Sequence, residues 1–306
     1  MKLLKKQRHL MHFAILITTL FFLFLTLTSG IYRHDMAIEK YLALGKEERF
    51  NCVGQVLRMD DGVWKAGASC VQIDSVTLLS AAHVFIRELK KDTVVDINGQ
   101  KWKTYIQKGI YKESEDNFRF LILNTIVKAR TITFHPTYMT QKNCDLAVIK
   151  LELPVRGLKN IPLYTGTDEL GDTVTGVGFG ASGPANRPDL VNGYNLKIAG
   201  MNSIDSIGGP TFNGQGSILY ADFDAPDKRN GCNRMGGADP LELEYCTGGG
   251  DSGGPLFTHK KGEMYLVGIT SGGGVNPTDR MKNGYYCKVI GWTRISTFIQ
   301  WINETN

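Results

Sequence analysis

Residues 246–256 read CTGGGDSGGPL, a stretch in which five glycines surround one serine, Ser252. Glycine adopts backbone dihedrals that other residues avoid, so this composition favours a tight turn that another molecule can approach closely. Such a turn can aim the N–H groups of Gly250 and Ser252 at one point, where a negatively charged oxygen would be stabilised. Because a serine hydroxyl needs a neighbouring base to become a nucleophile, the stretch is either a nucleophile turn or a glycine-rich surface loop.

Two segments upstream contain a histidine and an acid in suitable contexts. Residues 76–84 read VTLLSAAHV, an apolar strand that runs through two alanines into His83. Residues 144–151 read CDLAVIKL and place Asp145 at the start of an apolar strand. A carboxylate is costly to bury there unless it is hydrogen-bonded, and an imidazole N–H would meet that need. We therefore expect His83, Asp145 and Ser252 to meet.

The three segments resemble the motifs of the trypsin/chymotrypsin family of serine proteases. GDSGGP is similar to the family's nucleophile loop, SAAH to its histidine motif, and HPTY at 135–138 followed by DLAVIKL to its aspartate motif. The order His, Asp, Ser contradicts an esterase of the α/β-hydrolase type, where serine comes first. Val84 stands where many vertebrate members carry a cysteine, so the chain is closer to bacterial-type members without the histidine-loop disulfide.

This resemblance, over residues 50–303, implies a role for each site residue. His83 would be the general base, Asp145 would orient it, and Ser252 would form an acyl-enzyme. The N–H groups of Gly250 and Ser252 would form the oxyanion hole, which Asp251 would help to shape. Four further residues would contact the substrate, namely Cys246, Ser271, Gly273 and Gly284.

The specificity pocket is open to two alignments. Counting six residues back from Ser252 puts Cys246 at the base of the pocket, which favours an uncharged, medium or large apolar side chain in the substrate. If Cys246 is instead the cysteine that the family usually has four places before the serine, Thr247–Gly250 contains a two-residue insertion, which would bring Glu244 to the base and favour a cation. We expect the ungapped count with its neutral pocket, which would pair Cys246 with Cys287 in a disulfide.

Short apolar segments with turn signals begin at residue 50 and predict an all-β fold. The resemblance implies two six-stranded antiparallel Greek-key barrels, over about 50–160 and 161–290, with the active site in the cleft between them. Apolar residues at i, i+3 and i+4 spacing predict a closing helix over 293–302. Asp60-Asp61-Gly62 predicts a hairpin turn, and residues 90–106 predict two strands around an Asn98-Gly99 turn.

The N-terminus differs in composition from the rest. Residues 1–30 hold four cations and no acid, and residues 10–28 form an almost uncharged run before the small residues 28–30. This layout is typical of a cleaved signal peptide, although the run is also long enough for a membrane anchor. We expect a secreted or periplasmic protein, or a membrane-anchored one with its protease domain outside the cytoplasm. Residues 31–49 are interpreted as a linker or pro-segment with a short helix around 36–44.

Charge and cysteine content limit the partners. The chain carries +5, and without the four cations of residues 1–30 the remainder is +1, which gives no basic footprint for nucleic acid. All six cysteines follow residue 30, an even number that is consistent with disulfides in an exported protein. Cys52 is expected opposite Cys70, either as a disulfide or as two buried thiols. We expect a monomer acting on a protein or peptide substrate, without cofactor or metal.

Three questions stay open at this level. The acidic residues Glu113, Glu115 and Asp116 form either a calcium loop, as in trypsin, or a solvated loop. The predicted function is an exported serine endopeptidase, and the alternative is a protease-fold binding protein that holds a partner. In the family a new N-terminus pairs with the acid before the serine, but no Ile-Val-Gly-Gly occurs between residues 31 and 60. We therefore expect activity without cleavage after Arg49.

Overall fold

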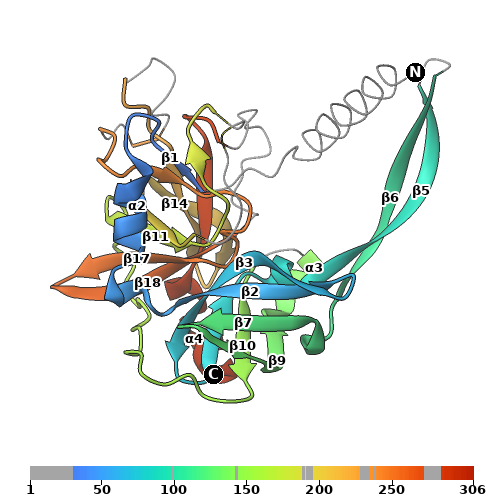
Figure 1. Cartoon of the computed structure of the whole chain (residues 1–306), viewed down its shortest axis with the longest axis horizontal. Helices are drawn as coiled ribbons and strands as arrows, with labels where there is room; N and C mark the ends of the chain where they lie inside the picture. Colours follow the sequence, from blue (N-terminus) through green and yellow to red (C-terminus); the bar gives the residue numbers. More distant parts are fainter. Residues whose placement is uncertain are drawn as a thin grey trace, which may run out of the picture.

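The computed structural model describes residues 30–97, 100–141, 144–187, 190, 196–227, 235–236, 239–271 and 284–306. Strands dominate this part of the chain, and most of them lie in two seven-stranded sheets (Figure 1). Every strand pair within these two sheets is antiparallel. The all-β fold with two halves and a short C-terminal helix is thereby confirmed.

The first sheet holds strands from residues 53 to 151, in the order β8-β7-β2-β3-β4-β10-β9. β2 and β3 are joined at the predicted hairpin turn, where Asp61 and Gly62 have φ of 51° and 77°, as a two-residue turn of this kind requires. Buried apolar side chains form a core around Phe85, Phe118 and Phe120. The strands are β2 (Val53–Asp60), β3 (Val63–Asp74), β4 (Thr77–Ser80), β7 (Phe118–Ile122), β8 (Thr125–Val127), β9 (Ala129–Phe134) and β10 (Ala147–Leu151).

The second sheet has the order β13-β11-β17-β18-β19-β15-β14. Its core contains Phe223, Tyr286 and Trp292. The predicted closing helix is α4 (Ile295–Thr305), which begins two residues later than expected and runs three residues further. The strands are β11 (Thr173–Gly178), β13 (Ile198–Ser203), β14 (Ser206–Phe212), β15 (Gln215–Asp222), β17 (Pro255–Lys260), β18 (Glu263–Thr270) and β19 (Val289–Arg294).

Each sheet has one strand more than the six that the resemblance implied. Among the edge strands, β8 ends the first sheet and β14 ends the second. Both are joined to the preceding or following strand by a short connection, β7 to β8 and β14 to β15.

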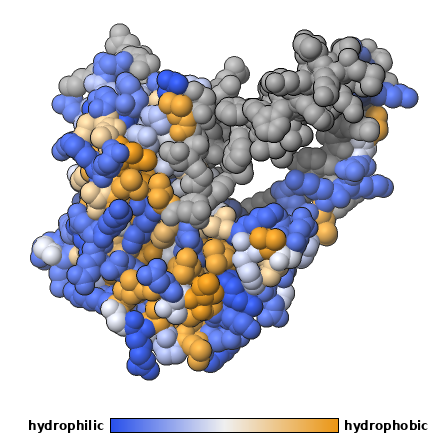
Figure 2. Space-filling view, in the orientation of Figure 1, coloured by the Kyte–Doolittle hydropathy of each residue, from blue (hydrophilic) through white to orange (hydrophobic). Residues whose placement is uncertain are grey.

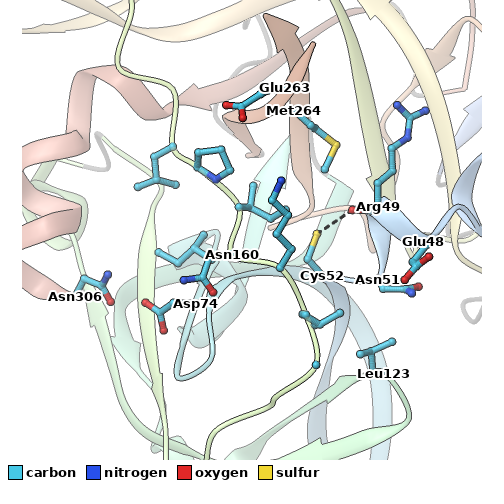
Figure 3. A pocket seen from close by; sticks show the side chains of 17 residues that line it. Glu48, Arg49, Asn51, Cys52, Asp74, Leu123, Asn160, Glu263, Met264 and Asn306 are labelled. Carbon is cyan, nitrogen blue, oxygen red and sulfur yellow. Dashed lines mark hydrogen bonds between the residues drawn. The ribbon is translucent and has the colours of Figure 1, made fainter. Parts of the chain in front are cut away.

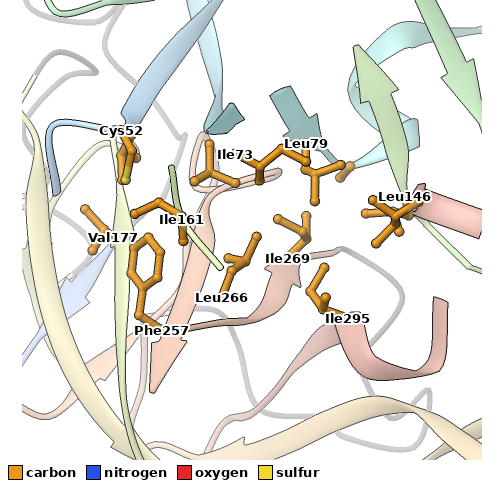
Figure 4. Close-up of a cluster of buried hydrophobic side chains, with 14 of the residues drawn as sticks. Cys52, Ile73, Leu79, Leu146, Ile161, Val177, Phe257, Leu266, Ile269 and Ile295 are labelled. Carbon is orange, nitrogen blue, oxygen red and sulfur yellow. The ribbon is translucent and has the colours of Figure 1, made fainter. Parts of the chain in front are cut away.

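A third apolar cluster joins the two sheets (Figure 4). Leu79 of β4 comes from the first sheet, Phe257 of β17 and Ile269 of β18 come from the second, and Ile295 comes from α4. All four side chains are fully buried. Because protein interiors are packed as densely as crystals, this cluster fixes the sheets relative to one another, and residues from both can form one site.

Residues 31–49, expected as a linker or pro-segment, pack against the second half. β1 (Ile31–Tyr32) lies between β12 (Gly183–Pro184) and β16 (Tyr245–Cys246) in a small sheet. The short helix predicted around 36–44 is α2 (Ile38–Gly45), and its Tyr41 is fully buried. A short 3-10 turn, Glu48–Phe50, follows and buries Phe50.

A two-stranded ribbon extends away from the rest of the molecule (Figure 1). β5 (Ile86–Ile97) and β6 (Gln100–Lys112) pair with each other along their whole length and belong to neither large sheet. They contain the two strands predicted within residues 90–106, whereas the expected Asn98-Gly99 turn lies outside the described residues.

The predicted signal peptide or anchor at residues 1–29 lies outside the described residues as well. In the part of the chain that the structure describes, no helix has the length and apolarity to cross a membrane.

The cysteines correct two expectations. Gly54, and not Cys52, lies opposite Cys70, because a two-residue turn and a bulge after Val56 shift the register of β2 and β3. Cys52 and Cys70 are both buried thiols, which was the second of the two predicted alternatives. Cys246 is also a buried thiol, so the expected Cys246–Cys287 disulfide is wrong.

Candidate active site

His83 is held at the end of the first sheet. β4 ends at Ser80, and a short 3-10 turn, Ala82–Phe85, carries the histidine. Ala81 and Ala82 are fully buried, so larger side chains would not fit beneath this turn. The backbone N–H of His83 donates to Asp145 Oδ1 at 2.8 Å, which ties the turn to the start of β10.

The structure brings His83, Asp145 and Ser252 together. His83 Nδ1 lies 2.6 Å from Asp145 Oδ2, and His83 Nε2 lies 2.8 Å from Ser252 Oγ. When Nδ1–H donates to the carboxylate, Nε2 is left as the acceptor for the serine proton. The histidine and the acid belong to the first half and the serine to the second, so the site depends on the packing between the sheets.

The charge state of His83 is set by two opposing effects. Burial of the ring disfavours the imidazolium and lowers its pKa, whereas the charge of Asp145 and the hydrogen bond to it raise that pKa. Burial is the largest single contribution, but the charge and the hydrogen bond of Asp145 together outweigh it, and the pKa of His83 lies above its ordinary value of 6.5. The surroundings of His83 therefore favour the imidazolium form of its ring.

The turn around Ser252 requires glycine at defined positions. Gly250 and Gly253 have φ of 93° and 82°, in the left-handed region that side chains avoid. A Cβ on Gly253 would lie 2.0 Å from Ser80 Oγ and 2.3 Å from the carbonyl oxygen of Ser69. Among the described residues, no acceptor takes the N–H groups of Gly250 and Ser252, so both remain available to an incoming oxygen.

Ser69 in β3 fixes this turn and was not identified from the sequence. Its backbone N–H donates to the carbonyl of Ser252 at 2.9 Å, and its hydroxyl donates to the carbonyl of Gly250, also at 2.9 Å. The same hydroxyl accepts from the N–H of Phe179 at 3.0 Å. A serine inside a strand carries no sequence signal for such a role, because the partners are 110 or more positions away.

Asp251, next to the serine, points away from it into the second half of the molecule. Its carboxylate accepts from the hydroxyl of Tyr245 at 2.7 Å and from the N–H groups of Gly180 at 2.9 Å and Gly248 at 3.0 Å. The backbone N–H of Gly30, the first described residue, is a further donor. Burial raises the pKa of Asp251 to about 6, although these hydrogen bonds oppose the rise.

The expected substrate-binding residues are only partly described. Cys246 and Ser271 are 1% and 9% exposed, and Ser271 directly follows β18. Gly284 has a φ of 89° and lies against the side chain of Ile31. Gly273 lies outside the described residues.

Glu244, the other candidate for the pocket base, is 1% exposed. The N–H of Leu241 donates to its Oε2 at 2.8 Å, whereas its Oε1 has no partner among the described residues. Burial raises the pKa of Glu244 to about 9, and the neighbouring Asp224 adds to the rise. At pH 7 this side chain is therefore a neutral carboxylic acid.

The acidic loop proposed for calcium is occupied by the protein's own cations. Glu113 is buried and pairs with Arg58 and Arg87, and Glu115 pairs with Lys112. No cluster of metal-ligating side chains is present in the described ranges. Glu113 and Glu115 thus act as structural ion-pair partners.

A cavity of about 800 Å³ lies elsewhere, beside the connection between the two halves (Figure 3). Cys52, Asn160 and Met264 are among the residues that line it, and none of the candidate site residues does. Burial raises the pKa of Cys52 to about 12, so its thiol is not a reactive nucleophile at neutral pH.

Comparisons with known proteins agree with the geometry. The family model described as Trypsin matches residues 48–302. The urokinase-type plasminogen activator of Gallus gallus is similar to the chain, with 25% identity over 247 residues. The match covers 76% of the chain and 49% of that protein, so the chain spans about half the length of this curated relative.

Proposed function

The chain belongs to the trypsin family, and on that premise we propose that it is a serine endopeptidase with His83, Asp145 and Ser252 as its catalytic residues. The observation that carries the proposal is the continuous hydrogen-bonded path from Ser252 Oγ through both ring nitrogens of His83 to Asp145 Oδ2. The substrate would be a protein or peptide, and the enzyme would act as a monomer.

Each step of peptide hydrolysis has a group in place. Ser252 Oγ attacks the scissile carbonyl while His83 Nε2 takes its proton, and the same nitrogen then gives the proton to the leaving amine. The N–H groups of Gly250 and Ser252 stabilise the oxyanion. Water, activated by the same nitrogen, releases the acyl group from Ser252. Asp145 holds the tautomer throughout and stabilises the imidazolium.

A protease-fold binding protein is the competing function. A protein that only holds a partner has no need of a base within 2.8 Å of the serine, nor of two unoccupied N–H groups beside it. Labelling with a fluorophosphonate separates the two, because the reagent needs an activated serine. We expect covalent labelling of Ser252, lost in Ser252→Ala and His83→Ala; an unlabelled parent protein would favour the binding protein.

The specificity pocket is proposed to accept uncharged side chains. Cys246 supplies no charge, and the raised pKa of Glu244 keeps that carboxyl neutral at pH 7. Cleavage of a peptide library tests this: a medium or large apolar residue should precede the cut bonds. A dominant preference for Arg or Lys that is lost in Glu244→Gln would contradict it.

Asp251 is proposed to pair with the amine of Gly30 after removal of the signal peptide. The N–H of Gly30 already donates to the buried carboxylate, and a cut after Ser29 would place an ammonium at the same point. Cleavage after Arg49 is not needed, since residues 31–49 are packed into the structure and Phe50 is fully buried. Export to the periplasm or the medium would then also complete the active site.

A further inference from the structure

The hydroxyl of Ser69 in β3 is buried and is bonded across the two halves of the molecule. Hydrophilic residues cover much of the described surface, where polar side chains can hydrogen-bond with water (Figure 2). Ser69 is 0% exposed, so its hydroxyl depends on partners within the protein. Serine side chains often bond to backbone groups nearby in sequence, but the two partners of Ser69 Oγ lie 110 and 181 positions away, in the second half.

Both residues that supply the oxyanion N–H groups are held by Ser69. Its backbone N–H donates to the carbonyl of Ser252 at 2.9 Å, and its hydroxyl donates to the carbonyl of Gly250, also at 2.9 Å. Any residue except proline would supply the first bond, whereas the second needs a side chain with a donor. A single residue of the first half thus fixes Gly250 and Ser252 relative to one another.

Gly250 depends on this hydroxyl more than Ser252 does. Among the described residues, the bond from Ser69 Oγ is the only hydrogen bond that the backbone N–H and C=O of Gly250 make. The turn is closed by a bond from the N–H of Asp251 to the carbonyl of Gly248 at 3.1 Å, which involves neither Gly249 nor Gly250. Glycine has the greatest backbone freedom, so three consecutive glycines do not fix the Gly250 N–H by themselves.

The same hydroxyl connects Gly250 to the buried carboxylate beside it. Ser69 Oγ accepts from the N–H of Phe179 at 3.0 Å, and the next N–H, that of Gly180, donates to Asp251 Oδ1 at 2.9 Å. Because Asp251 directly follows Gly250, these bonds close a ring through Ser69, residues 179–180 and residues 250–251. A polar network whose members are all bonded makes the segments that it joins more rigid.

We propose that Ser69 is a positioning residue of the active site, whose hydroxyl places the Gly250 N–H so that the oxyanion hole is complete. The proposal rests on the proposed endopeptidase function. Because the oxyanion develops only in the transition state, its two donors act on kcat and not on the binding of the substrate. Loss of the hydroxyl therefore lowers kcat and leaves KM unchanged. It also leaves the pKa of His83 unchanged, since the hydrogen bonds of His83 go to Asp145 and Ser252.

Peptide hydrolysis by Ser69→Ala tests this proposal. We expect kcat to fall roughly ten- to hundredfold at constant KM, somewhat less than when an oxyanion donor is removed outright. The rate of labelling by a fluorophosphonate should fall by a similar factor at every pH, while the midpoint of its pH dependence, which reports the pKa of His83, stays that of the parent. A shifted midpoint, or a loss confined to KM, would overturn the proposal.

The matched control is Ser296→Ala in α4. Ser296 is 9% exposed, and its hydroxyl also donates over 2.9 Å, but to Glu169 Oε1 and not to the turn. Each variant removes one buried hydrogen bond, so both should lower Tm by roughly 2–10 °C, and kcat is measured well below either Tm. Only Ser69→Ala should lose kcat. Equal kcat values in the two variants would make Ser69 a structural residue and overturn the proposal.

Amide hydrogen exchange separates the role of Ser69 from the proposed function. The N–H groups of Gly253 and Gly254 donate to the carbonyls of Thr270 and Asp251 at 2.8 Å, and they should exchange faster in Ser69→Ala than in the parent or the control variant. Equal exchange in all three proteins would overturn the positioning role.

The two failures have different signatures. If the parent neither cuts peptides nor takes the label, the endopeptidase function fails, and faster exchange in Ser69→Ala still assigns Ser69 to the placement of the turn. If the parent is active and Ser69→Ala matches it in both kcat and exchange, the function stands and the positioning role fails.

Discussion

The turn around Ser252 and the β5–β6 ribbon both adjoin His83, yet they are built in opposite ways. In the turn, neighbouring atoms leave no room for a methyl group on Gly253, and Asp251 is completely buried. In the ribbon, a methyl group added to Gly109 would meet no described atom within 4 Å, and most described side chains are exposed. Substitutions in the turn should therefore lower the activity towards every substrate, whereas substitutions in the ribbon should lower it by small amounts and only for some substrates.

The largest effect is expected from the catalytic residues themselves. Ser252→Ala should reduce kcat by roughly 10⁴- to 10⁶-fold, and adding His83→Ala should cost little more, because the residues act as a unit. The measurement is peptide hydrolysis, with circular dichroism to show that the variants fold. Near-parental hydrolysis by Ser252→Ala would contradict the assignment of the nucleophile.

The comparison can be tested directly with two glycine substitutions. Gly253→Ala would place a methyl group 2.0 Å from Ser80 Oγ at a φ of 82°, and should destabilise the protein by at least about 3 kcal/mol. Gly109→Ala, in β6, should change the free energy of unfolding by less than about 1 kcal/mol. Urea denaturation measures both; similar losses would show that the ribbon is packed as tightly as the turn.

The same contrast explains what could be predicted from the sequence. The turn and the two upstream motifs could be predicted because each requires particular residue types locally. These are glycine at left-handed dihedrals, alanine beneath the histidine ring, and an acid on an apolar strand. The strands of the ribbon could also be predicted, from the turn sequence Asn98-Gly99 between them. Its isolation could not, since a local pattern does not show that no other strand pairs with it.

Long-range partners were the features that the sequence did not reveal. Ser69 holds Gly250 and Ser252 from a strand in the other half, and Gly30 reaches Asp251 across more than two hundred residues. Residues 31–49 were expected as a linker because they are polar, but Ile31, Tyr32 and Tyr41 are buried against the second half. The register of Cys52 and Cys70 depends on a bulge at Gly67 of β3, for which the local signal is a glycine inside a strand.

Changing the N-terminus of the protein tests how far the activity of the turn around Ser252 depends on Gly30. A protein beginning at Gly30 should be fully active, and one with a few additional residues before Gly30 should lose about 100-fold or more in kcat/KM, because the buried carboxylate of Asp251 would then lack a countercharge, which costs several kcal/mol. Asp251→Asn should lose activity in both forms. N-terminal sequencing of the active protein checks the premise, and equal activity of the two forms would rule out the pair with Asp251.

The smallest effect is expected from substitutions of two glutamates, a buried one before the turn and an exposed one in the ribbon. Burial raises the pKa of Glu244 to about 9 in the folded protein, against 4.5 for an unperturbed glutamate. A raised pKa of an acid stabilises the folded state below pH 4.5, and this stabilisation is lost progressively as the pH rises towards 9. Gln mimics the neutral acid and does not ionise. Glu244→Gln should therefore raise Tm by roughly 5 °C at pH 8 and hardly at all at pH 5.

Glu88→Gln in β5 is the matched control for that prediction, because the side chain of Glu88 is 42% exposed and lies near Lys90. Its Tm should match the parent's within about 1 °C at both pH values, since exposed ion pairs contribute little to stability. Thermal melts at pH 5 and pH 8 measure both variants. If Glu244→Gln gives the same change in Tm at both pH values, Glu244 is ionised in the folded protein, and the proposal of a neutral specificity pocket loses its electrostatic support.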